Sequence, residues 1–61
     1  MVRFELTDGA SFIVFVNEKP FGWVSKQHGF HVDSTVVNDF IEVTASDLRK
    51  IADKIDELKA A

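Results

Sequence analysis

The sequence predicts a small α+β protein in which an antiparallel β-meander of four to five strands carries one C-terminal α-helix on one face. Short apolar or alternating segments occupy residues 2–43, turn-forming residues separate these segments, and residues 45–59 repeat apolar side chains at helical spacing. A chain of 61 residues is too short for two domains. We therefore expect residues 1–61 to form a single compact domain, with the sheet over residues 2–43 and the helix over residues 45–59.

The first hairpin is predicted from the alternating segment Val2–Leu6 and the Asp8-Gly9 pair that follows it. Glycine adopts the positive φ that tight hairpin turns require. A three-residue loop would pair Phe4 with Phe12 and collect the apolar residues of both strands on one face. A two-residue loop would turn the second strand over, because a shift of one residue exchanges the two faces of a strand. We favour the three-residue loop.

The second hairpin is predicted at Asn17–Pro20, a segment of turn-forming residues between two apolar runs. If Glu18 and Lys19 form its tip, Val14 faces Trp23 across the two strands. Trp23 then belongs to the core, on the face to be covered by the helix.

The third turn is predicted at residues 28–29, and it places Phe30 and Val32 on the same core face. Residues 34–39 are either a loop or an extension of the fourth strand. Residues 40–43 are predicted to form a short last strand.

The helix has the clearest signals in the sequence. Thr44 followed three residues later by Asp47 matches a capping box, in which a hydroxyl and an acid cap the first turn reciprocally. Charged residues fill the faces away from the predicted buried stripe. On this pattern, Leu48→Ala or Ile55→Ala should each cost ~2–5 kcal/mol. The stripe consists of Leu48, Ile51, Ala52, Ile55 and Leu58.

Composition disfavours several classes of function. The formal net charge is −3 and the basic residues are scattered, so nucleic-acid binding is not expected. The longest apolar run, Phe12–Val16, is far shorter than the ~20 residues of a membrane span. The chain has no cysteine, and its first residues lack the apolar segment of a signal peptide, so we expect a cytoplasmic protein.

Catalytic and metal-binding motifs are weak. No serine lies in a recognisable nucleophile motif, and the three glycines are isolated, so we expect neither an enzyme nor a phosphate-binding loop. His28, His31 and Asp33 are the one cluster that resembles metal ligands. His28 fits a turn better, and a zinc site would want a third or fourth ligand beyond those on the strand. We expect no metal and no cofactor.

The sheet face opposite the helix is the remaining feature that suggests a function. The predicted registers place an apolar centre there inside a polar rim, which is the anatomy of a protein-binding surface. Five residues are the predicted partner-binding set: Ile13, Phe15, Val24, Lys26 and His31. The expected function is a non-enzymatic protein–protein interaction module. A homo-oligomeric structural subunit is the first alternative, with the face packed against its own copy, and a single-strand nucleic-acid binder is the second.

The segment Phe40–Leu58, a short strand running into a capped amphipathic helix, resembles the ending of many small bacterial and phage proteins. The resemblance covers about a third of the chain and implies no activity. It suggests a bacterial or phage origin. Together with the predicted binding face, this origin leads us to expect a phage- or bacterium-encoded inhibitor or adaptor that binds a host protein through its sheet face.

Overall fold

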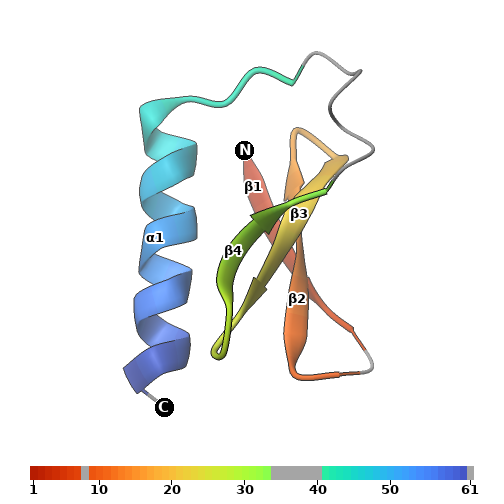
Figure 1. The fold of residues 1–61 in the computed structure, drawn as a ribbon. Helices are drawn as coiled ribbons and strands as arrows, with labels where there is room; N and C mark the ends of the chain where they lie inside the picture. The colour runs from red at the N-terminus through yellow and green to blue at the C-terminus, as the bar shows by residue number, and fades with distance from the viewer. Residues whose placement is uncertain (8, 34–40, 61) are drawn as a thin grey trace.

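The computed structural model describes residues 1–7, 9–33 and 41–60. Its elements form an α+β meander, as predicted: a single antiparallel sheet with the strands in chain order, and one C-terminal helix that packs on one face (Figure 1). The elements are β1 (Val2–Leu6), β2 (Ser11–Val16), β3 (Lys19–Ser25), β4 (Gly29–Val32) and α1 (Ala45–Ala60).

The first hairpin places the apolar residues on the predicted face, but in a different register. Phe4 pairs with Val14 and Leu6 pairs with Phe12, two residues away from the predicted pairing of Phe4 with Phe12. The turn lies one residue later in the chain than predicted, because the Thr7 N–H donates to the Ser11 carbonyl at 3.0 Å. A shift of two residues leaves every side chain on its face. The predicted role of Asp8 in the turn lies outside the described residues.

The second hairpin turns one residue earlier than predicted. Asn17 and Glu18 form its tip, with φ values of 52° and 67°, and Val16 pairs with Lys19. Positive φ at both tip residues is typical of the tight turn that matches the twist of two paired strands. Asparagine is one of the residues that adopts this conformation most readily.

A β-bulge then changes the faces of β3. The register shifts between Val14 and Phe15, so that Val14 pairs with Gly22 and Ile13 pairs with Trp23. The prediction that Trp23 faces Val14 in the core is therefore wrong. Val24 is fully buried instead, and its predicted position on the partner-binding face is wrong for the same reason. A bulge exchanges the two faces beyond the point where it is inserted.

Gly22 makes the close approach of β4 possible. A Cβ at this position would collide with the His31 carbonyl oxygen and press on the Phe30 ring. On the core face, Phe30 pairs with Val24 and Val32 pairs with Gly22. The Phe30 ring stacks on the Phe21 ring, with the ring centroids 5.6 Å apart. Glycine inside a strand commonly marks such a contact.

The core lies between the sheet and α1. Val14, Val16, Val24 and Ile51 are buried, and half-buried aromatic and aliphatic side chains surround them. Ile41 and Val43 also pack against this cluster. Residues 41–43, the described part of the predicted last strand, form no strand. Their apolar side chains are thus explained by packing against the core.

The helix begins as the capping box predicts. The Thr44 N–H donates to Asp47 Oδ2 and the Asp47 N–H donates to Thr44 Oγ1, both at 3.1 Å. The buried stripe is rotated from the predicted one, because Asp47 and Ile51 are its buried residues while Leu48 is 53% exposed. Leu48 therefore does not belong to the core. No helix in the described part of the chain is long and apolar enough to cross a membrane.

Candidate functional site

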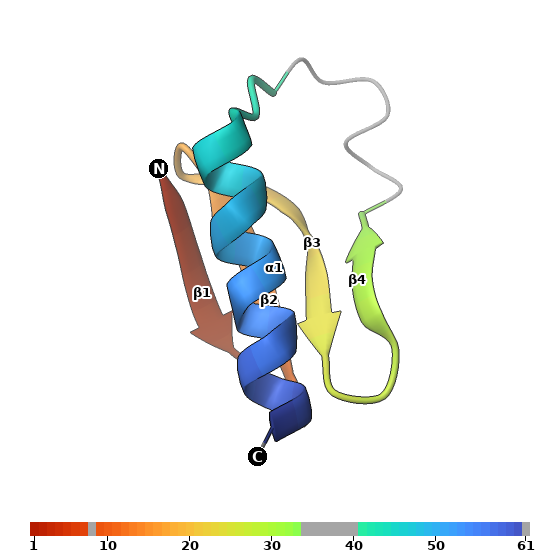
Figure 2. The same cartoon turned by 90° about the vertical axis from the view of Figure 1, so that its left-hand side faces the viewer.

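The candidate site is the sheet face opposite α1, here called the outer face. In Figures 1 and 2 the helix lies along only one side of the sheet, and no described element covers the other side. Successive side chains of a strand point to opposite faces, so the residues that alternate with the buried ones belong to this surface. The outer face consists of Arg3, Glu5, Ile13, Phe15, Trp23 and His31.

Trp23 lies at the centre of the outer face. It belongs to an inner strand, pairs with Ile13 on one side and with His31 on the other, and keeps 41% of its surface exposed. Ile13 and Phe15 are half-buried in the same surface. A large indole ring on an inner strand is usually covered in a folded protein. The exposed Trp23 ring therefore offers a flat apolar surface for contact. Its backbone is fixed by the strands that pair with β3 on both sides.

Paired charges border this apolar centre beside β1. The Arg3 guanidinium lies 4.2 Å from the centre of the Phe15 ring, a cation–π contact. It also pairs with Glu5 at 2.8 Å and with Glu18 at 3.1 Å. Hydrogen bonds to Glu18 and then to Glu5 raise the pKa of Arg3 above its ordinary value. The cation therefore stays charged, and two carboxylates compensate it.

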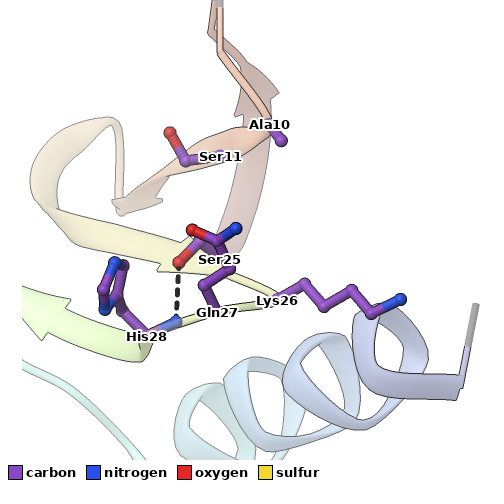
Figure 3. A pocket seen from close by; sticks show the side chains of 6 residues that line it. All are labelled: Ala10, Ser11, Ser25, Lys26, Gln27 and His28. Atoms are coloured by element: carbon purple, nitrogen blue, oxygen red, sulfur yellow. Dashed lines mark hydrogen bonds between the residues drawn. The ribbon is translucent and has the colours of Figure 1, made fainter.

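A shallow hollow of about 340 Å³ lies at the end of the outer face where β2 begins and β3 ends. Ser11 and Ser25 pair across its floor, and the turn between β3 and β4 forms one wall (Figure 3). The Ser25 hydroxyl accepts a hydrogen bond from the His28 backbone N–H at 3.1 Å, and the Ser11 hydroxyl lies 3.1 Å from that of Thr7. Both hydroxyls thus have local partners that hold the turns in place.

The two histidines lie next to each other. The rings of His28 and His31 meet edge to face with their centroids 5.8 Å apart, His28 from the turn and His31 from β4. Within the described residues, no group of three or more potential ligands is arranged to hold a metal ion. The arrangement is that of two aromatic side chains at the rim of the outer face.

The structure places the predicted partner-binding residues in three different environments. Ile13, Phe15 and His31 share the outer face, as predicted, although the registers that place them there differ from the predicted ones: His31 pairs with Trp23 and not with Lys26. Val24 is in the core. Lys26 belongs to the turn after β3, and Figure 3 shows its side chain extending away from the two serines.

Sequence reasoning missed Trp23, the central residue of the outer face. The signal that could have found it is Gly22, because a glycine between Phe21 and Trp23 inside an otherwise bulky strand indicates a bulge or a close approach. A bulge at that point turns Trp23 away from the core and Val24 into it.

Three comparisons with known proteins complete the description of the site. No family model, curated protein or solved structure matches this chain. The function of the protein is therefore inferred from the geometry and chemistry of the outer face.

Proposed function

We propose that the protein is a small, non-enzymatic binding module that recognises another protein through the outer face. The observation that carries the proposal is the exposed Trp23 ring at the centre of a hydrogen-bonded sheet surface that no described element covers. Ile13 and Phe15 extend the apolar area around it, and charged side chains form its border. This combination of an apolar centre and a polar rim is characteristic of protein–protein interfaces.

Trp23 is the expected energetic centre of such an interface. Tryptophan and arginine are enriched among the residues that dominate binding energy, and these residues lie near the centre of an interface where water is excluded. Trp23 loses little conformational freedom on binding, because the backbone on both sides of it is already fixed in the ladder. The hollow at Ser11 and Ser25, where β2 begins and β3 ends, offers a place for one side chain of the partner.

The charge of the outer face favours a protein partner over nucleic acid. Its one arginine, Arg3, is held by two carboxylates, so the cation is compensated before any ligand arrives. Single-strand binders combine stacking rings with a cationic groove, whereas the net charge here is −3. We infer a partner that presents an apolar patch with neutral or basic surroundings. An inhibitor or an adaptor, acting in the cytoplasm of a bacterial or phage-infected cell, would fit this description.

The test is a comparison of two surface variants that carry the same chemical change. Trp23→Ser removes the apolar centre of the outer face, and Leu48→Ser removes a comparably exposed apolar side chain from α1. Immobilised wild type and both variants are exposed to a lysate of the source organism, and the bound proteins are identified. We expect one protein to bind wild type and Leu48→Ser and to be lost with Trp23→Ser.

The same variants, together with the fluorescence of Trp23, distinguish a protein-binding module from a nucleic-acid binder and from a homo-oligomer. Trp23 is the single tryptophan, so its fluorescence reports directly on contact with the outer face. A partner retained equally by all three proteins would contradict the proposal. A fluorescence change on adding single-stranded DNA at low salt, absent in high salt, would favour the nucleic-acid reading. Loss of self-association in Trp23→Ser would favour a homo-oligomer joined through this face.

A further inference from the structure

The free edge of β1 carries a row of outward-pointing backbone groups. The Thr7 N–H donates to Ser11 and the Asn17 N–H donates to the Met1 carbonyl, so the odd-numbered residues of β1 bond to β2. Hydrogen-bonded and non-bonded pairs alternate in an antiparallel ladder. The N–H and C=O groups of Val2, Phe4 and Leu6 therefore point away from β2. No described strand lies on that side, and Figure 2 shows β1 at the margin of the molecule.

We propose that this edge binds a second copy of the chain, β1 against β1, in an antiparallel pair centred on Phe4. The sequence of β1, Val-Arg-Phe-Glu-Leu, is complementary to itself in this arrangement. Arg3 lies opposite Glu5 of the second copy, and Glu5 lies opposite Arg3 of the second copy. The two sheets join into one.

The hydrogen-bonding pattern fits the same register. Phe4 meets Phe4 of the second copy, and Val2 meets Leu6, so each outward N–H finds a carbonyl across the dyad. Arg3 and Glu5 then occupy a non-hydrogen-bonded pair, in which opposite side chains come closest. Opposite charges in such a position stabilise a sheet.

Charge also excludes the neighbouring registers. Sliding the second copy by two residues keeps the backbone groups aligned but places Arg3 opposite Arg3, or Glu5 opposite Glu5, depending on the direction. Like charges directly opposite each other destabilise an antiparallel pair. A shift of one residue would set outward groups against inward ones. The centred register alone satisfies both the backbone and the charges.

The core face of β1 supplies the apolar part of the contact. Leu6 is 66% exposed in the single copy although it shares a face with Phe4 and Val2. In the centred register Leu6 lies beside Val2 of the second copy, which covers part of this surface. Pairing of unprotected edge strands is a common mode of association.

The dimer would strengthen the proposed function without depending on it. A continuous sheet holds both helices on one side and both outer faces on the other. Two Trp23 surfaces would then be presented in the same direction, and a partner with two matching sites would bind more tightly than to either copy alone.

The test uses charge reversal and its complement. Sedimentation equilibrium is measured on wild type, Arg3→Glu, Glu5→Arg and the double exchange, over concentrations extending to about 1 mM. We expect wild type to dimerise and each single variant to dimerise roughly ten-fold more weakly or worse, because two attractive pairs become repulsive. The double exchange and an equimolar mixture of the two single variants should both recover the wild-type affinity.

Amide hydrogen exchange locates the contact. Amides of Val2, Phe4 and Leu6 should exchange more slowly as the concentration rises, whereas those of Arg3 and Glu5, already bonded to β2, should not change. Leu6→Pro, which removes an outward donor at an exposed position, should weaken the dimer without altering any charge. A monomeric wild type at about 1 mM, a mixture no tighter than its components, or unchanged exchange at the even-numbered amides would each overturn the proposal. Dimers abolished by Trp23→Ser but not by Leu6→Pro would also overturn it.

Discussion

Trp23 and Val24 are neighbours in β3, yet one is 41% exposed at the centre of the outer face and the other is fully buried beneath α1. Both are apolar, and nothing in their own side chains decides which face each takes. The β-bulge, which lies between these two residues and the preceding turn, determines which face each one takes. It shifts the pairing of β3 with β2 by one residue from that of a regular hairpin. The candidate site of this protein is therefore determined by the backbone geometry of the bulge at Phe21, which lies between the paired residues Pro20 and Gly22.

The largest expected effect comes from placing a charge on each side of β3. Val24→Asp would bury an unpaired carboxylate in the core, which costs more than ~4 kcal/mol, comparable with the whole stability of a domain this size. Trp23→Asp places the same carboxylate on the exposed face and should leave the fold intact. Circular dichroism and dispersion of the amide NMR signals distinguish the two. A folded Val24→Asp together with an unfolded Trp23→Asp would mean that the faces are assigned the wrong way round.

A second pair of variants makes the same comparison on the helix. Ile51 is 3% exposed against the sheet and Leu48 is 53% exposed. Ile51→Ala should therefore lower the free energy of unfolding by ~2–5 kcal/mol. Leu48→Ala should lower it by about 0.5 kcal/mol or less. Urea denaturation measures both values, and equal losses would show that the helix packs on the stripe predicted from the sequence, which contains both Leu48 and Ile51.

Gly22→Ala tests the close approach of β4 to β3, one residue beyond the bulge. The added methyl group would meet the His31 carbonyl and the Phe30 ring, so we expect a loss of ~1–3 kcal/mol, the usual range for overpacking. Gly9→Ala is the matched control, because a Cβ there meets no atom within 4 Å. Urea denaturation of both variants checks the prediction. A Gly22→Ala variant as stable as wild type would indicate that β3 and β4 do not approach as closely as described.

Local signals in the sequence were sufficient for the fold and for the helix start. The alternation of β1 and the Thr44–Asp47 capping box are each encoded within a few residues, and the structure contains both. The second and third turns were predicted in the right segments but at the wrong residues: the second has its tip at Asn17 and Glu18, and the third lies at residues 26–28. The first register was predicted two residues away from the observed one. The error does not change the faces, because the side-chain period of a strand is two.

The candidate site could be predicted only in part. Ile13 and Phe15 follow from the first hairpin alone, whereas Trp23, Val24 and Lys26 depend on a turn position and on a bulge. Glycine is needed at position 22 because His31 and Phe30 of the next strand approach it closely. The sequence of β3 alone does not reveal this approach. Leu48 was wrongly predicted to be buried because the spacing of apolar residues in α1 is compatible with two neighbouring stripes of the helix surface. Packing against the sheet selects the stripe that contains Asp47 and Ile51.

The smallest expected effect concerns the polar residue at the top of the core. Asp47 is buried. The hydrogen bond from the Thr44 N–H lowers the pKa of its carboxyl, and the Thr44 hydroxyl and the Met1 amino group act in the same direction, whereas burial opposes the shift. Thr44→Ala removes the reciprocal half of the cap and should lower the free energy of unfolding by ~0.5–2 kcal/mol at neutral pH.

The pH dependence of the Asp47 contribution follows from the direction of its shift. A carboxyl whose pKa is lower in the folded state stabilises the fold above its ordinary pKa of ~3.9, and that stabilisation is lost as the pH falls through the folded value. Asp47→Asn cannot titrate, so the stability advantage of wild type over this variant should be constant near neutrality and shrink in acid. Urea denaturation at a series of pH values measures the difference. If the difference in free energy of unfolding between wild type and Asp47→Asn stayed the same in acid, the Asp47 cap would stabilise the helix through its hydrogen bonds alone. Its negative charge at the helix N-terminus would then make no contribution.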